Sequence, residues 1–216
     1  MGESLSQSAG QIERRGAPGR ERADAARNRQ RVLAAAEELF ARQGAHNVTM
    51  EDIARAAGVG KGTLYRRYPD RASIAVALLD EHERALQGRL LSGPPPLGPG
   101  APPAERLAAF YAAMVELLER HIHLALGAEQ GARRFATGAY GFWRAHVHAL
   151  LAAGERAPAR AAGGAAGARL DALVDVLLAP LAPELYAYQR EQRHRSPAEI
   201  TAALTELAHA VLGAHE

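Results

Sequence analysis

The side chains best suited to binding a charged partner lie in the segment KGTLYRRY, residues 61–68. It holds three cations, with a threonine and a tyrosine between them. Leu64 alone is strongly apolar, so a helix formed here would bury Leu64 and turn the cations outward. Such a helix offers hydrogen-bond donors to phosphates and to base edges in the major groove of DNA, which is about 12 Å wide.

The elements predicted around this segment are those of a three-helix DNA-binding unit. Apolar residues at spacings of three and four predict a long first helix, which begins at an Asp24 cap and ends at Gly44. Thr49 is placed to cap a short second helix, TMEDIARAAG, which glycines within 58–60 end. Pro69 ends the third helix. KGTLYRRY is therefore expected to be the second helix of a helix-turn-helix pair.

Composition divides the chain into three parts. Residues 1–23 show no periodicity and are expected to form a flexible arm, and residues 24–71 form the DNA-binding domain, with the helix-turn-helix at 49–68. Residues 72–216 form a larger helical domain, which contains a loop rich in proline and glycine at 91–103. No useful run alternates in the manner of a strand, so the expected fold class is all-α.

Two further helix starts are indicated in this larger domain. Asp70 is a cap for a fourth helix that turns Ile74 and His82 inward. Ser196, with Pro197 at the first helical position and Glu199 after it, begins the last helix. Three long helical stretches lie between these starts, and prolines interrupt the third.

The run TMEDIARAAGVGKGTLYRRYPDRASI resembles the N-terminal signature of TetR-type transcriptional regulators. The upstream run RVLAAAEELFARQG resembles the first helix of that family, and the resemblance covers residues 27–79. The chain departs from the pattern at Arg71, where the family usually has lysine, and at Tyr68, where phenylalanine is more frequent. Beyond this region only the length and the all-helical organisation agree.

The resemblance implies which residues contact DNA. Thr49 would bind a phosphate through its side chain or amide, and Gly62 would let the backbone approach the DNA closely. The arginines would contact base edges or phosphates, and an arginine that binds guanine through two hydrogen bonds contributes about 1–3 kcal/mol of discrimination. The full predicted set is Thr49, Lys61, Gly62, Thr63, Tyr65, Arg66, Arg67 and Arg71.

A regulator of this type needs an effector molecule that controls it, and the aromatic residues of the larger domain suggest where that effector binds. We expect a mainly apolar pocket for a small lipophilic effector between helices. Its predicted lining is Phe110, Met114, Leu117, His121, Phe135, Tyr140, Trp143, His146 and Val147. The alternative, a solid core with ordinary aromatics, stays open for each of these residues.

A homodimer follows from geometry, because one short helix contacts few base pairs and a palindromic operator requires two-fold symmetry. Two apolar stripes are the candidates for a four-helix seam between subunits. The predicted interface is Leu170, Leu173, Leu177, Ile200, Leu204, Leu207 and Val211. The alternative is that these stripes close the core of the monomer.

No metal site or cofactor is expected. The chain has no cysteine, which excludes disulfides and thiolate metal centres. His121 and His123, like His146 and His148, lie two apart on a helix and point about 200° from each other, so neither pair can chelate alone. The run GVGKGT has no glycine at position 55 and no preceding strand, so it is not a phosphate-binding loop.

The expected function is that of a homodimeric repressor, released from double-stranded DNA by its effector. Residues 1–71 hold 13 basic and 9 acidic side chains, the direction that DNA contact requires. Two alternatives without DNA binding are a helical adaptor that binds proteins and an enzyme on a helical bundle, but no nucleophile elbow or zinc-protease motif is present. No apolar run is long enough for a membrane span and no signal core is present, so the expected location is the cytoplasm.

Overall fold

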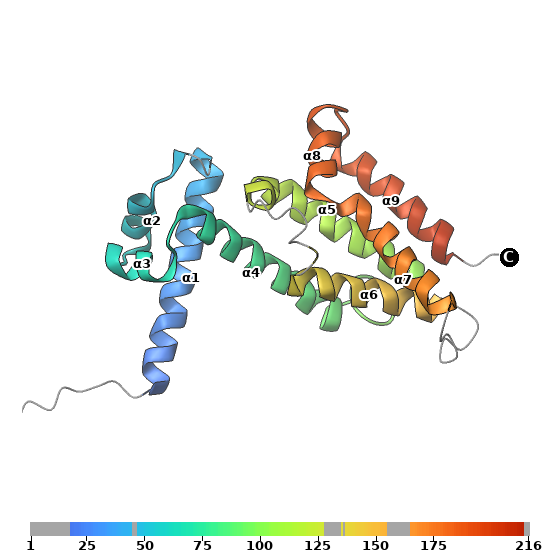
Figure 1. Ribbon diagram of the computed structural model, residues 1–216, viewed down its shortest axis with the longest axis horizontal. Helices are drawn as coiled ribbons and strands as arrows, with labels where there is room; N and C mark the ends of the chain where they lie inside the picture. Colours follow the sequence, from blue (N-terminus) through green and yellow to red (C-terminus); the bar gives the residue numbers. More distant parts are fainter. Residues whose placement is uncertain (1–17, 45–46, 128–134, 136, 155–164, 214–216) are drawn as a thin grey trace, which may run out of the picture.

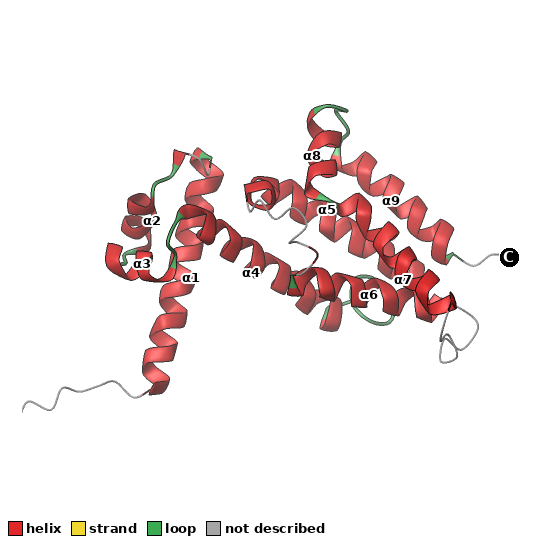
Figure 2. Cartoon of the chain, viewed as in Figure 1, coloured by secondary structure: helices red, strands yellow, loops and turns green. Residues whose placement is uncertain are grey.

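The computed structural model describes residues 18–44, 47–127, 135, 137–154 and 165–213, and within these ranges the chain is helical with no strand (Figure 2). The all-α prediction is therefore confirmed. The elements are α1 (Pro18–Gln43), α2 (Met50–Ala57), α3 (Lys61–Arg67), α4 (Arg71–Ser92), α5 (Pro103–Gly127), α6 (Gly138–Gly154), α7 (Ala165–Leu178), the 3-10 helix η4 (Ala179–Leu181), α8 (Pro183–Glu191) and α9 (Pro197–Leu212).

Helices α1, α2 and α3 form an N-terminal unit with its own core, closed by the first turns of α4. Two of the predicted caps are confirmed here: Thr49 and Asp52 form a capping box on α2, and Asp70 forms one with Ser73 on α4. Gly58 ends α2 with φ of 62°, a left-handed conformation that favours glycine. The turn to α3 is thus fixed by local chemistry.

Helix α4 runs from the N-terminal unit to the other helices, which form a C-terminal bundle (Figure 1). Helix α5 packs against α4, α6, α8 and α9, so it is the centre of that bundle. Near its C-terminal end, α5 also places Leu124 in the core of the N-terminal unit, where Leu124 is 2% exposed. The two parts of the molecule therefore share a packed contact besides the α4 connection.

The bundle is closed by apolar packing and by a few polar contacts. The hydroxyl of buried Tyr111 donates to the carbonyl of Leu177 at 3.0 Å, which ties α5 to α7. On the other side, Arg190 of α8 donates twice to the carboxylate of Glu119, with both nitrogen–oxygen distances at 2.9 Å. None of the helices in the described ranges is long and apolar enough to cross a membrane.

Several predicted boundaries are wrong. Helix α1 begins at Pro18, so Asp24 lies inside it and pairs with Arg27 instead of capping it. A helix entry at proline is chemically favourable, because its missing N–H would be unpaired there. The predicted loop at 91–103 is shorter, since α4 extends to Ser92 and α5 begins at Pro103. Helix α8 was not predicted, and residues 1–17 of the expected arm lie outside the described residues.

Candidate functional site

Helix α3 presents one face to the protein and the rest to solvent. Leu64 is 1% exposed and is the one residue of α3 that is buried. At about 100° per residue, Gly62 and Arg66 lie roughly 160–200° from Leu64, on the outermost line of the helix. Thr63 and Tyr65 flank that line, and both are exposed. The outer face of α3 therefore combines a bare backbone, a guanidinium group and two hydroxyls.

The remaining α3 cations lie at the sides of this face. Lys61 is exposed, and its Nζ lies 3.3 Å from Oε1 of Glu51 on α2. The guanidinium of Arg67 lies over the ring of Tyr68, 6.0 Å from its centroid. The pair of Lys61 with Glu51 is exposed, and exposed ion pairs are weak, so Lys61 can exchange Glu51 for another anion. Tyr68 itself is buried, as predicted for a packing residue.

Thr49 and Arg71 both make hydrogen bonds within the protein, and their phosphate contacts stay predictions. The amide and the hydroxyl of Thr49 both donate to Oδ2 of Asp52, at 3.1 and 2.6 Å. Both Thr49 donors are therefore used to cap α2. Arg71 is half-buried and donates from Nη1 to the carbonyl of Val48 at 3.1 Å, which ties α4 to the loop before α2.

Two arginines of α1, which sequence reasoning missed, hold the ends of α2 and α3 in place. Arg31 donates to the carbonyls of Ala57 and Gly58 at the end of α2, at distances from 2.6 to 2.9 Å. Arg29 donates to the hydroxyl of Tyr68 and to the carboxylate of Glu81, each at 3.1 Å. Arg29 therefore links α1, the end of α3 and α4, and no local spacing pattern could have indicated this link.

The C-terminal bundle contains a cavity of about 540 Å³ beside α4. This volume suits a small molecule. Five of the predicted lining residues do line it, namely Met114, Leu117, His121, Tyr140 and Trp143. Sequence reasoning missed the polar wall that α4 contributes, which consists of Asp80, Glu83, Arg84 and Gln87.

Four predicted lining residues lie elsewhere. Phe110 and Val147 are wholly buried in the bundle core, and His146 packs its ring against Phe110 at 5.3 Å between centroids. Phe135 is 53% exposed and meets the ring of Tyr140 edge-on. An apolar stripe does not reveal which of its members face a hollow and which face solid packing, so the sequence could not separate these four residues from the five that line the cavity.

Glu83 gives the cavity an unusual acid. Burial, followed by the neighbouring carboxylate of Asp80, raises the pKa of Glu83 to about 7, and Arg84 acts in the opposite direction. The Glu83 carboxyl therefore changes charge near neutral pH. A ligand cation placed beside it would favour the ionised form.

His146 makes the fold sensitive to acid. Burial, and then Arg106, lowers the pKa of His146 to about 4, and its Nε2 is buried without a hydrogen-bond partner. The unfolded chain takes up this proton near pH 6.5, whereas the folded chain does so only near pH 4. The stability that neutral His146 contributes is therefore complete above pH 6.5 and is lost as the pH falls towards 4.

We expect His146→Leu to reduce this loss of stability. Relative to the unmodified chain, the variant should gain up to about 3 kcal/mol in free energy of unfolding between pH 7 and pH 4, because its core residue has no proton to accept. Urea unfolding at several pH values measures the difference. His148→Leu, an exposed site two residues further along α6, is the control, and an identical pH dependence in all three chains would contradict the expectation.

The predicted dimer residues mostly serve the chain's own core. Leu170, Leu177, Ile200 and Leu204 are all buried within the bundle, where they pack in the chain's own core. This burial favours the alternative, in which the stripes close the core of the monomer, and the subunit seam itself stays a prediction. The other three, which are Leu173, Leu207 and Val211, are half-buried against the same core.

Comparisons with known proteins match this architecture. Residues 32–78 match the family of bacterial regulatory proteins named tetR. An HTH-type transcriptional regulator of Staphylococcus aureus is 43% identical over 53 residues, which are 24% of this chain and 29% of the relative. The chain thus aligns with less than a third of the length of such curated relatives.

Solved structures extend the likeness to the whole fold. A transcriptional regulator from Rhodococcus sp. Rha1 superposes with a TM-score of 0.62 at 19% identity, over 85% of this chain and 95% of that one. The fatty acid degradation regulator FadR from Bacillus halodurans gives 0.55 at 16% identity, over 87% and 99%. Residues 32–78 therefore match the family of bacterial regulatory proteins named tetR, and the chain as a whole shares its fold with solved transcriptional regulators.

Proposed function

We propose that the chain is a homodimeric transcriptional repressor, which binds a palindromic operator through α3 and leaves it when a small effector binds. The observation that supports this most is the outer face of α3, where Gly62 and Arg66 stand opposite the single buried residue Leu64. Its place of action is the cytoplasm, where its DNA target lies. In this role the chain acts by binding DNA and the effector, and it catalyses no reaction.

Dimerisation follows from the size of the reading helix. Helix α3 has seven residues and is about 10 Å long, so one copy reads only a few base pairs. Two copies can read half-sites about 34 Å apart, one turn of DNA. We place the subunit seam on the exposed faces of α7 and α9, where Val176 is 63% exposed and Ala202, Ala203 and Ala210 leave room for close approach.

The effector would bind in the cavity beside α4. Its apolar walls suit a lipophilic body, and the carboxyls of Asp80 and Glu83 suit a cationic or hydrogen-bond-donating group on that body. Because α4 forms one wall, a ligand of this kind would displace α4. The Arg29 bonds to Tyr68 and Glu81, and the Arg71 bond to Val48, would then transmit that shift to the reading unit.

Selection of bound sequences from a random pool of double-stranded DNA tests the proposal. We expect enrichment of one palindrome with two half-sites, because the dimer presents two α3 helices related by two-fold symmetry. Lipophilic amines that raise the melting temperature of the protein should then release it from that palindrome. A pool that stays random after selection would contradict the proposal.

Replacement of Gly62 tests DNA contact and protein stability separately. A Cβ atom added at Gly62 would meet nothing within 4 Å, so Gly62→Ala fits the folded chain. We expect its free energy of unfolding to rise by about 0.5–1 kcal/mol, because alanine is the better helix former. Affinity for the selected palindrome should fall, because the new methyl group would stand between α3 and the DNA. Urea unfolding and fluorescence anisotropy measure the two effects, and unchanged affinity would remove Gly62 from the interface.

A further inference from the structure

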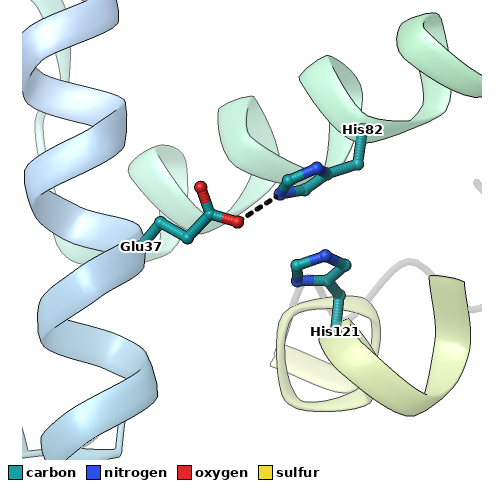
Figure 3. Close-up of side chains that lie close together, drawn as sticks. All are labelled: Glu37, His82 and His121. Carbon is teal, nitrogen blue, oxygen red and sulfur yellow. Dashed lines mark ion pairs between the residues drawn. The ribbon is translucent and has the colours of Figure 1, made fainter.

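Three side chains from three helices meet where the N-terminal unit joins the bundle (Figure 3). Glu37 comes from α1, His82 from α4 and His121 from α5. Their nitrogen and oxygen atoms lie within 4.8 Å of one another. Nε2 of His82 lies 3.0 Å from Oε1 of Glu37, and the two imidazole rings stack with 3.9 Å between centroids.

One polar atom of this cluster forms no hydrogen bond within the part of the chain that the structure describes. Nε2 of His82 is buried and makes no hydrogen bond, although the carboxylate of Glu37 is close to it. The stacked rings are inclined by only 17°, so the imidazoles pack face to face. Neutral imidazole is the form that binds metal ions.

We propose that Glu37, His82 and His121 form a binding site for a divalent transition-metal ion of the Zn²⁺ class. Two imidazole nitrogens and one carboxylate oxygen are a known protein ligand set for zinc, and they leave one position open. With bonds of about 2.0–2.1 Å, the two nitrogens would lie about 3.3 Å apart. Because the lone pairs lie in ring planes that are inclined by only 17°, the two rings would have to turn apart by tens of degrees before both lone pairs pointed at one ion.

The position of the site gives the ion a regulatory use, and this step rests on the proposed function. Glu37 belongs to the DNA-binding unit, His121 belongs to the bundle, and His82 lies on the helix that connects them. An ion bound to all three would fix the angle between the reading helix and the bundle. His121 also lines the effector cavity, and α5 departs from helical geometry at that residue, with φ −131° and ψ 19°. Metal and effector would therefore act on the same turn of α5.

Metal binding is tested first without DNA. The full chain, stripped of metal with EDTA, is titrated with Zn²⁺ by calorimetry, and with Co²⁺, whose visible absorption reports its coordination. We expect one ion per chain, and at least about tenfold weaker binding in His82→Gln and His121→Gln. Glu37→Gln, at a side chain that is 45% exposed, is the variant with the least risk to folding. His123→Gln, an exposed histidine two residues from His121, should bind as the unmodified chain does.

The outcomes separate this proposal from the proposed function. Failure of the unmodified chain to bind either ion, or unchanged affinity in the folded variants, would overturn the metal site. A second titration measures affinity for the selected palindrome with and without Zn²⁺, where we expect a change of about fivefold or more that His121→Gln abolishes. No change there would overturn the regulatory use alone. Metal binding by a chain that selects no DNA would leave the site standing and the proposed function contradicted.

Discussion

Replacing Arg66 with alanine should lower the affinity of the chain for its selected palindrome by about ten- to a hundredfold. Arg66 lies on the outermost line of α3, opposite buried Leu64, so it is the cation best placed to enter the major groove. A guanidinium group can donate two hydrogen bonds to one guanine, and their loss costs about 1–3 kcal/mol. The same variant should discriminate less between bases at the position that Arg66 reads.

Fluorescence anisotropy with the palindrome and with single-base variants of it measures both effects. Arg120→Ala is the matched control, because it removes the same charge from an exposed site on α5. Arg66→Lys keeps the charge but loses the two-pronged geometry, so it should recover phosphate attraction without base preference. Equal affinities for Arg66→Ala and Arg120→Ala would place the reading surface elsewhere.

Replacing Phe110 with alanine should reduce the free energy of unfolding by about 3–5 kcal/mol. The Phe110 ring is fully buried and contacts the rings of Trp143 and His146, with centroids 5.7 and 5.3 Å away. The surrounding helices cannot collapse fully into the space left by the ring, so both packing and apolar burial are lost. The melting temperature should fall by about 10 °C or more.

Phe135→Ala is the matched control for this experiment, because it removes the same ring from a position that is 53% exposed. Its cost should stay near the value of one edge-on aromatic contact, about 0.5–1.5 kcal/mol. Calorimetry and urea unfolding of both variants give the comparison. Similar losses at the two positions would contradict the division between core and surface aromatics described above.

Local chemistry made most helix boundaries predictable from the sequence. Thr49, Asp70 and Ser196, which were predicted as caps, each form a capping box, and α2 ends at Gly58, within the glycine segment that was predicted to end it. These features depend on residues within one turn of each other. The start of α1 was misjudged because Asp24 resembles a cap, whereas the entry is at Pro18.

The candidate DNA-binding surface could be predicted from the sequence only where its residues lie on one helix. The exposed face of α3 follows from the position of Leu64, and the structure confirms that exposure at Lys61, Thr63 and Tyr65. The internal partners of Thr49 and Arg71, which are Asp52 and Val48, accept from donors that DNA would also use, and the pattern of α3 gives no sign of them.

The cavity and the seam depend on packing between distant helices. Periodicity shows that Leu170 and Ile200 face something apolar, but it does not show whether that is the same chain or a second copy. The acid Glu83 lies on α4, far in sequence from the aromatic residues that suggested a pocket. The cluster of Glu37, His82 and His121 escaped notice for the same reason, since its members are spread over three helices.

Leu124 makes the packing of the N-terminal unit depend on the bundle. This residue belongs to α5 of the bundle, yet it fills a place among the buried side chains of the N-terminal unit. If the N-terminal unit of this chain were joined to a different bundle, its core would lack the Leu124 side chain and would contain a cavity at that position. The N-terminal unit and the bundle are therefore not freely interchangeable. A change of bundle during evolution would have to keep an apolar side chain at this position or replace the contact that it makes.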